Sequence, residues 1–304
     1  MESHCIVANL RRVPGDSMKE TNRNIEGKTC LITGATNGIG RVTAVELARM
    51  GAELFLIYRD QARADETVAE IRKKTGNEKV HLLHADLGSQ KQIRGVAAEF
   101  LATGKPLHVL VNNAGLGNTK RMMTEDGIEM VFVVNHLAYF LLTILLLERI
   151  KQSAPARIVN VASEAHRFGT INFDDLGGER RYSTFGAYGQ SKLANILFSY
   201  ELARRLEGTG VTVNCLHPGS IASGLWTNNG PFARFIMKAG TLFLKTPEQG
   251  AQTTIYLASS PEVEGVTGKY YASCKEKTSN KESYDLDVAR RLWEVSSGMT
   301  GVGA

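Results

Sequence analysis

Short apolar runs alternate with longer amphipathic stretches along most of the chain. The short runs are rich in branched aliphatic residues, which is typical of strands buried on both faces of a parallel sheet. The longer stretches repeat their apolar positions at helical spacing. This alternation predicts an α/β fold with one doubly wound parallel sheet of about seven strands and helices on both faces. We expect strands at residues 28–33, 53–58, 80–84, 108–111, 157–162, 211–216 and 266–271.

The amphipathic stretches place helices between these strands. One start is well marked, because Thr246 is a good cap residue and Pro247 follows it at the first helical position. Another helix opens at Tyr188, where an apolar repeat with helical spacing begins. We expect the remaining helices at residues 41–50, 63–75, 89–103, 131–147 and 285–295.

No linker, repeat or low-complexity tract divides the chain, so we expect one domain over residues 27–304. Residues 1–26 are polar and mixed, and we expect a flexible lead-in there, not a signal peptide. Residues 220–245 are rich in aromatic and aliphatic side chains and contain no acidic residue. We predict that they form an apolar lid over a substrate site, with Phe168 and Phe173 of a long polar loop across the cleft.

The most apolar stretch, residues 131–147, resembles a membrane span in composition. It is short for that purpose, and Asn135 and His136 lie inside it. A doubly wound fold needs buried helices, so we favour a core or subunit-interface helix over a span. Because an unpaired buried amide is costly, Asn135 needs a partner, and a catalytic water chain would provide one. We interpret His136 as structural.

Composition narrows the classes of function. The 304 residues are 43% hydrophobic with a net charge of +5, and the charges are dispersed rather than clustered with aromatics. We therefore expect no nucleic-acid partner. The four cysteines have no C-x-x-C spacing, which argues against a zinc site and a disulfide framework and suits a reducing compartment. We expect a cytoplasmic protein without a metal ion.

A glycine-rich turn joins the first strand to the first helix. Its spacing is G-x-x-x-G-x-G, with Asn37 and Ile39 around the second glycine. A helix N-terminus that follows such a turn binds pyrophosphate through backbone N–H groups, as in the Rossmann dinucleotide fold. We expect Gly34 to allow the tight turn, Gly38 to let the phosphates approach, and Gly40 to let the helix pack on the strand.

Residues at the ends of the second and third strands indicate which dinucleotide is bound. An NAD site usually has an acid after the second strand, whereas Arg59 stands here and suits a 2′-phosphate. The alternatives are that Asp60, the next residue, weakens this preference, or that Arg59 is a solvated loop charge. Asp86 and Leu87 follow the third strand, where Asp86 could accept from the adenine amino group. The sequence predicts NADP(H), with NAD(H) less favoured.

Two further sites lie at strand ends. Asn112 and Asn113 follow the fourth strand, where amides can brace the sheet, and the small Ala114 and Gly115 admit a nucleotide. Ser163 follows the fifth strand at the carboxyl edge, where open α/β sheets bind ligands. Taken alone, the turn at Asp86 or the turn at residues 112–115 could also be an ordinary one.

Tyr188 and Lys192 stand four residues apart, on one face of a predicted helix. A free phenol has a pKa of about 10, and a nearby positive charge favours the phenolate. We therefore expect the Lys192 ammonium, together with a cofactor charge, to lower the pKa of Tyr188 towards neutrality. In isolation the same spacing is more often a surface pair.

Taken together and in this order, the motifs resemble the short-chain dehydrogenase/reductase family, and within it the retinol dehydrogenase-like branch. The resemblance covers about residues 27–275 and rests on Thr33-Gly34-x-x-x-Gly38-Ile39-Gly40, Asp86, Asn112-Asn113-Ala114-Gly115, Asn135, Ser163, Tyr188-x-x-x-Lys192 and Pro218-Gly219. The branch also shares the Arg59-Asp60 pair and the long loop between Ser163 and Tyr188.

The resemblance implies the roles of the site residues. Tyr188 is the general acid and base, Lys192 lowers its pKa and binds the nicotinamide ribose, and Ser163 orients the carbonyl. Asn135 holds a water that links Lys192 to solvent. Cofactor contacts are also implied at Pro218, Gly219, Ile221 and Ser223, the last where the family often has threonine.

The sequence as a whole predicts an NADP(H)-dependent oxidoreductase that interconverts a lipophilic aldehyde or ketone and its alcohol. We expect no membrane span, and a homodimer or homotetramer formed through the two most apolar helices. The alternatives are a dinucleotide-binding regulator or scaffold with little catalytic activity, and an enzyme of the same fold that acts on a sugar nucleotide.

Overall fold

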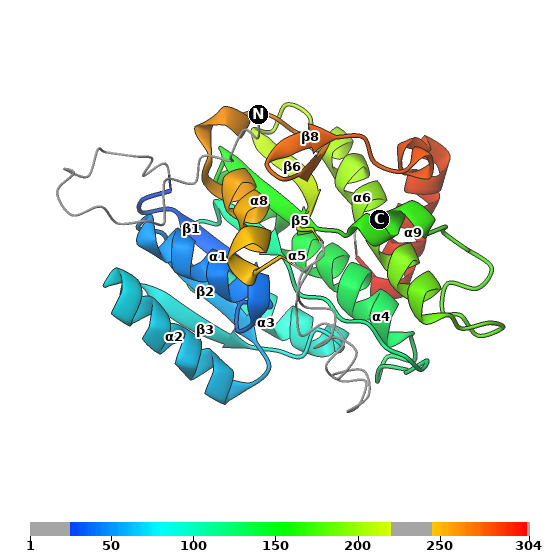
Figure 1. Ribbon diagram of the computed structural model, residues 1–304, viewed down its shortest axis with the longest axis horizontal. Helices are drawn as coiled ribbons and strands as arrows, with labels where there is room; N and C mark the ends of the chain where they lie inside the picture. Colours follow the sequence, from blue (N-terminus) through cyan, green and yellow to red (C-terminus); the bar gives the residue numbers. More distant parts are fainter. Residues whose placement is uncertain (1–24, 220–244, 303–304) are drawn as a thin grey trace.

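The computed structural model describes residues 25–219 and 245–302, and these form one sheet with helices on both faces (Figure 1). The strand order is β3-β2-β1-β4-β5-β6-β7-β8. Strands β1 to β7 are parallel, as predicted, and β8 pairs antiparallel with β7. The strands are β1 (Thr29–Thr33), β2 (Glu53–Tyr58), β3 (Val80–His84), β4 (Val109–Asn112), β5 (Ala156–Val161), β6 (Val211–His217), β7 (Lys269–Ala272) and β8 (Lys275–Lys277).

The helices form two layers. Helices α1, α2 and α8 cover one face of the sheet, whereas α3, α5 and α6 cover the other and α9 packs outside α6 (Figure 1). The α-helices are α1 (Gly38–Arg49), α2 (Gln61–Thr75), α3 (Gln90–Ala102), α4 (Met130–Phe132), α5 (Ala138–Gln152), α6 (Thr184–Arg205), α8 (Pro247–Ser259) and α9 (Leu286–Thr300). Short 3-10 turns are η2 (Glu164–Phe168), η5 (Pro261–Val263) and η6 (Lys281–Tyr284).

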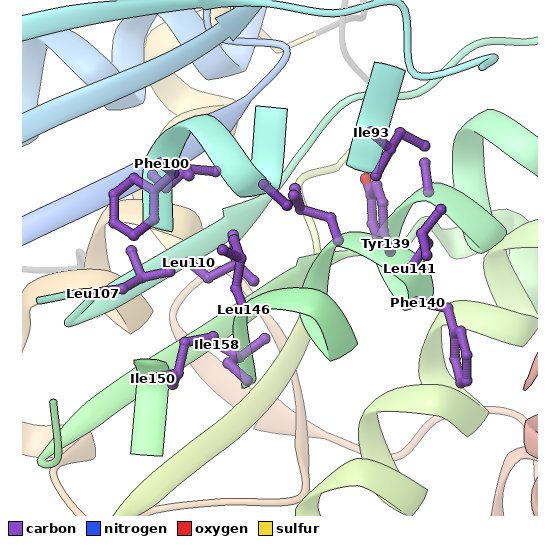
Figure 2. Close-up of a cluster of buried hydrophobic side chains, with 14 of the residues drawn as sticks. Ile93, Phe100, Leu107, Leu110, Tyr139, Phe140, Leu141, Leu146, Ile150 and Ile158 are labelled. Atoms are coloured by element: carbon purple, nitrogen blue, oxygen red, sulfur yellow. The ribbon is translucent and has the colours of Figure 1, made fainter. Parts of the chain in front are cut away.

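The larger core cluster lies between the sheet and the α3–α5–α6 layer. Figure 2 shows how side chains from α3, β4, α5 and β5 meet there, among them Phe100, Leu110 and Leu146, each with no exposed surface. A second cluster fills the space beneath α1, α2 and α8. With both faces covered, the inner strands β1, β2, β4, β5 and β6 have little solvent-accessible side-chain surface, which explains their near-continuous apolar sequences.

The apolar stretch that we compared with a membrane span forms a helical segment over Met130–Gln152. It has 23 residues, and its most apolar 18-residue window has a mean hydropathy of 2.2, so it is long and apolar enough to cross a membrane, but 78% of that window is buried inside the fold. The segment is not a continuous α-helix, because a π-helical turn over Val133–Leu137 separates α4 from α5. The burial is what a core helix requires.

Helix α9 covers the outer surface of α6 and α5. Trp293 is almost completely buried, and its ring centroid lies 5.0 Å from that of Phe140 and 5.9 Å from that of Phe198. Ala289 and Leu292 extend this contact along a third apolar cluster. The apolar faces that led us to expect a subunit interface are thus packed, at least in part, against the chain itself.

Strand β8 is one departure from the predicted count of about seven strands. It contains only exposed charged residues, Lys275, Glu276 and Lys277, and so has no apolar pattern. A two-residue turn joins it to β7, with Ser273 at φ 51° and Cys274 at φ 58°. Tight hairpins require positive φ at both positions but usually have asparagine or glycine there. The sequence therefore gave little indication of this hairpin.

The cysteine spacing led us to expect neither a zinc site nor a disulfide framework. Cys30 and Cys215 are buried free thiols, and burial raises the pKa of each to about 12.

Candidate active site

The predicted site residues lie at the carboxyl edge of the sheet, where β1, β4, β5 and β6 end. Strands β5 and β6 are neighbours in register, with Val161 opposite Leu216, and the N–H of Ala162 donates to the carbonyl of Leu216 at 2.7 Å. The turn that begins at Ser163 therefore lies beside the turn that contains Pro218 and Gly219. Residues far apart in the chain are brought to one edge by the parallel order of the strands.

The glycine-rich turn has the geometry predicted for it. Gly34 and Gly38 have φ of +65° and +48°, which glycine adopts without strain. A Cβ at Gly38 would have open space around it, whereas one at Gly40 would lie 2.1 Å from the carbonyl oxygen of Gly34. Asn37 caps α1 by accepting from the N–H of Gly38 at 2.8 Å. The free space at the N-terminus of α1 fits a pyrophosphate.

The residues predicted to contact the adenosine end lie together. The guanidinium of Arg59 is 3.5 Å from the carboxylate of Asp86, and 62% of the Arg59 side chain is exposed. Asp60 is engaged elsewhere, since its carboxylate caps α2 by accepting from the N–H of Arg63 at 3.2 Å. Leu87 is buried beside this pair. An exposed cation at this edge fits a 2′-phosphate better than an acid would.

Asn112 braces the sheet, as predicted for an amide at the end of the fourth strand. Its side chain is completely buried, and its amide donates to the hydroxyl of Thr143 at 3.0 Å and to the side-chain oxygen of Asn160 at 2.8 Å. It therefore braces β4 against α5 and β5, and its side chain is not available to a ligand. The neighbouring Asn113 braces β4 to β1 by donating to the carbonyl of Thr33 at 3.0 Å.

Tyr188 and Ser163 meet through their side chains. Tyr188 lies in the first turns of α6, and its phenol is hydrogen-bonded to the Ser163 hydroxyl. The Ser163 oxygen also accepts from the N–H of Ala165 at 3.2 Å, which fixes the rotamer of the serine at the start of η2. Burial raises the pKa of Tyr188 to about 12, although the bond from Ser163 acts in the opposite direction. The phenol is therefore protonated at neutral pH.

Lys192 lies one helical turn beyond Tyr188 and is buried, with 2% of its surface exposed. Its ammonium donates to the carbonyl of Val161 at 3.1 Å and lies 5.7 Å from the ring centroids of both Tyr188 and Tyr139. Burial lowers the pKa of Lys192 to about 7. We expected Lys192 to lower the pKa of Tyr188. In this structure burial dominates both groups, so the phenol is a weaker acid and the amine a weaker base than expected.

The side chain of Asn135 has three hydrogen bonds to protein groups. Its side-chain oxygen accepts from the N–H of Leu116 at 2.8 Å, and its amide donates to the carbonyl of Leu116 at 2.9 Å and to the hydroxyl of Ser191 at 3.0 Å. These bonds tie the π-helical turn to α6 one residue before Lys192. Asn135 is thus well placed to position Lys192.

Small residues leave room beside these groups. A Cβ at Gly115 would lie 3.4 Å from both the Asn135 side-chain oxygen and the Lys192 ammonium. The carbonyl of Ala114 accepts from the hydroxyl of Tyr139 at 2.7 Å. The predicted roles of Ala114 and Gly115, which were argued from their size, agree with this geometry.

The substrate side of the site is only partly described. Phe168 is 60% exposed and packs on Gly189 of α6, as a residue of the cleft could. Phe173 does not face the cleft: it is part of the third apolar cluster, and the guanidinium of Arg291 lies 4.2 Å from its ring centroid. Residues 220–244, which include Ile221, Ser223 and nearly all of the expected lid, lie outside the described residues.

Sequence reasoning missed three residues that border this site. Tyr139 follows Asn135 by four positions and so shares its helix face. Glu164 follows Ser163 directly, and His217 precedes Pro218. Their adjacency to motif residues was the available signal. His136, which we interpreted as structural, is fully buried with its ring 2.9 Å from the hydroxyl of Ser296, and burial lowers its pKa to about 4.

Comparisons with known proteins agree with this geometry. A family profile described as short chain dehydrogenase matches residues 28–233. Retinol dehydrogenase 14 from Homo sapiens is 45% identical over 317 residues, covering 96% of this chain and 93% of that protein. A protein of known structure from Mycobacterium paratuberculosis has a TM-score of 0.74 at 30% identity, covering 93% of this chain and 96% of that chain. The Pseudomonas aeruginosa RhlG/NADP active-site complex has a TM-score of 0.65 at 28% identity, covering 82% and 95%. The chain therefore belongs to the short-chain dehydrogenase/reductase family, in its retinol dehydrogenase-like branch, and is an oxidoreductase that acts on alcohol or carbonyl groups.

Proposed function

We propose that the protein uses NADP(H) to interconvert a lipophilic aldehyde or ketone and its alcohol. The observation that supports this most directly is the meeting of Tyr188, Ser163 and Lys192 beside Gly115 at the carboxyl edge of the sheet. This arrangement provides a proton donor, a hydrogen-bond donor and an amine around one space. A regulator with little catalytic activity would not need all three groups in contact, so the catalytic reading is favoured.

The roles of the residues follow from their contacts. When bound, the dinucleotide supplies or accepts the hydride. Tyr188 donates its phenolic proton to the substrate oxygen during reduction and accepts it back during oxidation. Ser163 donates a hydrogen bond to the same oxygen and stabilises the negative charge that develops on it. Lys192, when protonated, favours the phenolate and would hold the ribose next to it.

The pKa of Tyr188 supports a role in carbonyl reduction. Because burial raises this pKa to about 12, the phenol carries its proton throughout the neutral range. Reduction begins with Tyr188 as an acid, so the free protein already holds the required protonation state. Oxidation needs the phenolate, which becomes more accessible when a positive charge lies next to the phenol.

The preference for NADP(H) rests on Arg59, and it predicts a selective effect of Arg59→Ala. We expect NADPH binding to weaken by about 10–100-fold, since one charge-assisted contact to a phosphate contributes about 1.5–3 kcal/mol. NADH has no 2′-phosphate, so its binding should change little. The measurement is a fluorescence titration of each cofactor. Arg72→Ala, at the far end of α2 and similarly exposed, is the matched control. Equal losses for both cofactors would show that Arg59 does not contact the 2′-phosphate.

The proposed substrate class is supported by the exposed Phe168 and by the apolar sequence of residues 220–245. Each buried methylene contributes about 0.8 kcal/mol, so kcat/KM with NADPH should rise about fourfold per carbon along a series of straight-chain aldehydes until the pocket is full. Retinal-like molecules fit this class, and the human relative is a retinol dehydrogenase by name. A flat or falling series, or preference for a sugar or a carboxylate-bearing substrate, would contradict the proposal.

The oligomeric state and the cellular location stay predictions. A homodimer or homotetramer was expected because the helix of residues 131–147 and the helix that contains Tyr188 are so apolar. Burial of α5 within the fold and the packing of α9 on α6 weaken that reason. The cytoplasmic location was expected from the cysteine spacing.

A further inference from the structure

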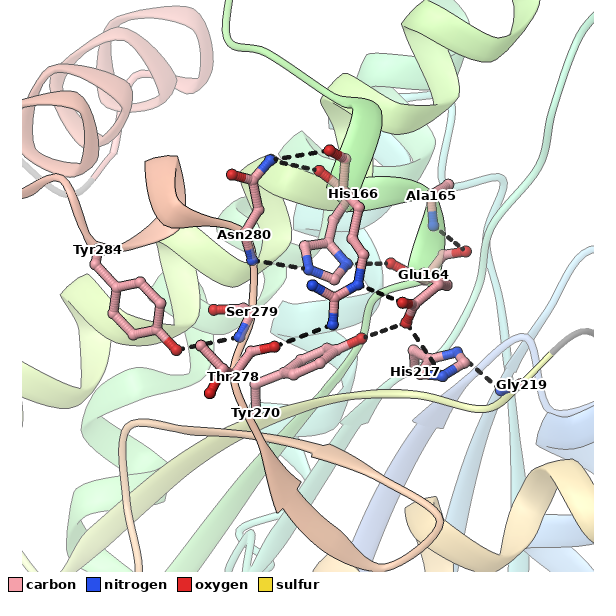
Figure 3. A network of polar contacts seen from close by, with 12 residues as sticks. Glu164, Ala165, His166, His217, Gly219, Tyr270, Thr278, Ser279, Asn280 and Tyr284 are labelled. Carbon is pink, nitrogen blue, oxygen red and sulfur yellow. Dashed lines mark hydrogen bonds and ion pairs between the residues drawn. The ribbon is translucent and has the colours of Figure 1, made fainter.

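A network of polar side chains lies directly behind the Ser163 turn (Figure 3). Glu164 is at its centre. One carboxylate oxygen lies 3.3 Å from Nε2 of His217 and 3.3 Å from the hydroxyl of Tyr270, and the other pairs with Arg167. The proposed chemistry uses none of these side chains. The network nevertheless connects the turn after β5 with the turn after β6.

The contacts of His217 fix its protonation state. The backbone N–H of Gly219 donates to Nδ1 of His217 at 3.0 Å, so Nδ1 must be an unprotonated acceptor. Nε2 then carries the ring proton and faces the Glu164 carboxylate at 3.3 Å. Only the neutral Nε2–H form of the imidazole satisfies both partners. Protonation of Nδ1 would place two donors against each other and break the bond to Gly219.

Both turns that the network joins belong to the proposed site. Ser163 immediately precedes Glu164, and the carbonyl of Ser163 is held from the other side by His166, whose Nδ1 lies 2.7 Å from it. Gly219 has φ of +94° and follows Pro218 in the turn expected to contact the cofactor. A shift of His217 would therefore move the serine turn and the cofactor turn relative to each other.

We propose that Glu164 and His217 are a pair of positioning residues, which hold the Pro218–Gly219 turn against the Ser163 turn in the geometry that binds the dinucleotide. This inference rests on the proposed function, because it assumes that the Pro218–Gly219 turn contacts a cofactor. Neither side chain touches the reacting atoms. His217 supplies an acceptor for the N–H of Gly219, and Glu164 keeps the proton of the neutral ring on Nε2, which leaves Nδ1 as that acceptor.

The pair makes cofactor affinity depend on pH in one direction. Burial lowers the pKa of His217, the Glu164 carboxylate raises it, and the cations Lys245 and Arg167 lower it further. The ring of Tyr270 stacks on the imidazole, and the two ring centroids are 6.4 Å apart. The imidazole is thus neutral at neutral pH, and the bond to Gly219 is lost as the pH falls through the pKa of His217. Cofactor affinity should fall with it.

Two substitutions separate the two contacts of His217. His217→Asn keeps an oxygen near the position of Nδ1, so it can still accept from Gly219, but it does not titrate. His217→Gln reaches towards Glu164 but leaves the N–H of Gly219 without its acceptor. At pH 7.5 we expect NADPH affinity close to that of wild type for His217→Asn, and about three- to tenfold weaker for His217→Gln, the effect of one neutral hydrogen bond.

The experiment is a fluorescence titration of NADPH from pH 5.5 to 8. The 2′-phosphate also gains a proton near pH 6, so each wild-type value is compared with that of His217→Asn at the same pH. We expect wild type to lose more affinity in acid than His217→Asn. Glu164→Gln should move this loss to lower pH, because the carboxylate raises the pKa of His217. His81→Asn, in an exposed histidine–glutamate pair with Glu53, is the matched control and should behave as wild type.

The outcomes distinguish a failure of the Glu164–His217 proposal from a failure of the proposed function. Equal NADPH affinity of His217→Asn and His217→Gln, or an acid loss that persists in His217→Asn, would overturn the positioning pair while leaving the proposed function intact. A wild-type protein that binds neither NADPH nor NADH would overturn the proposed function, and the pair with it. Circular dichroism of each variant at each pH confirms that the folded state is being compared.

Discussion

Replacing Tyr188 with phenylalanine is expected to lower the turnover of carbonyl reduction by about 10²–10⁴-fold, the usual contribution of general acid catalysis. The substitution removes one hydroxyl group and keeps the ring in its place beside Lys192. NADPH binding should remain within a few fold of wild type, because the loss lies in proton transfer and not in recognition. Single-turnover measurement of NADPH oxidation, together with a binding titration, checks both parts.

A matched control for this variant is available on the same helix. Tyr200 also lies on α6, and its hydroxyl is 2.9 Å from that of Ser279, away from the site. Tyr200→Phe makes the same chemical change and should leave turnover close to wild type. Turnover of Tyr188→Phe near that of Tyr200→Phe would exclude the proposed acid–base role.

Replacing Lys192 with methionine should lower kcat/KM by about 10²–10³-fold, comparable with the loss of one preorganised group at a reacting centre. Methionine keeps much of the length and apolar character of the side chain and removes the amine. The contacts that disappear are the bond to the carbonyl of Val161 and the approach to the Tyr188 ring. Lys151→Met, at the exposed end of α5, is the control.

Lys192→Met should also change how the stability of the protein depends on pH. The pKa of Lys192 is lowered from 10.5 to about 7 in the folded protein. Between these values the unfolded chain binds a proton that the folded protein does not, so the free energy of unfolding rises with pH over this window. Relative to Lys192→Met, the cofactor-free wild type should therefore gain stability from about pH 7 to 10.5. Urea unfolding at several pH values measures the difference, and a constant difference would show that Lys192 stays charged in the fold.

Much of the fold could be predicted, because the apolar runs that mark the strands and the residues that mark the turns depend on local sequence. The strands Glu53–Tyr58 and Val80–His84 begin and end where the apolar runs predicted. The glycine roles were also predictable, since they depend on backbone sterics that hold in any such turn. The ends of helices and strands were harder to predict where they depend on tertiary context. Helix α6 begins at Thr184, a turn before Tyr188, because Ser183 caps it.

The partners of buried amides could not be predicted from the sequence. Asn112 and Asn135 were both expected to need hydrogen bonds, and both have them. Which partners they find depends on strand register and on the π-helical turn, which rotates the side chains of Val133–Leu137 relative to an ideal helix. Spacing along the chain does not encode that rotation.

In the cofactor-free protein the pKa of Tyr188 lies above that of a free phenol, for a related reason. The sequence shows that an ammonium lies one helical turn away, and a charge at that distance favours the phenolate. It does not show how much water reaches either group. Helix α6 buries both side chains against the sheet, and the desolvation of two ionisable groups outweighs their attraction.

The packing of α9 has a consequence for how the protein is made. Its 15 residues come near the end of the chain, yet Trp293 completes a core begun by α5 and α6. The carbonyl of Met299 accepts from the side chain of Gln90 at 3.0 Å, across 209 positions of sequence. A nascent chain cannot form these contacts until residues 286–300 have left the ribosome. Until then the apolar surfaces of α5 and α6 are open to chaperones.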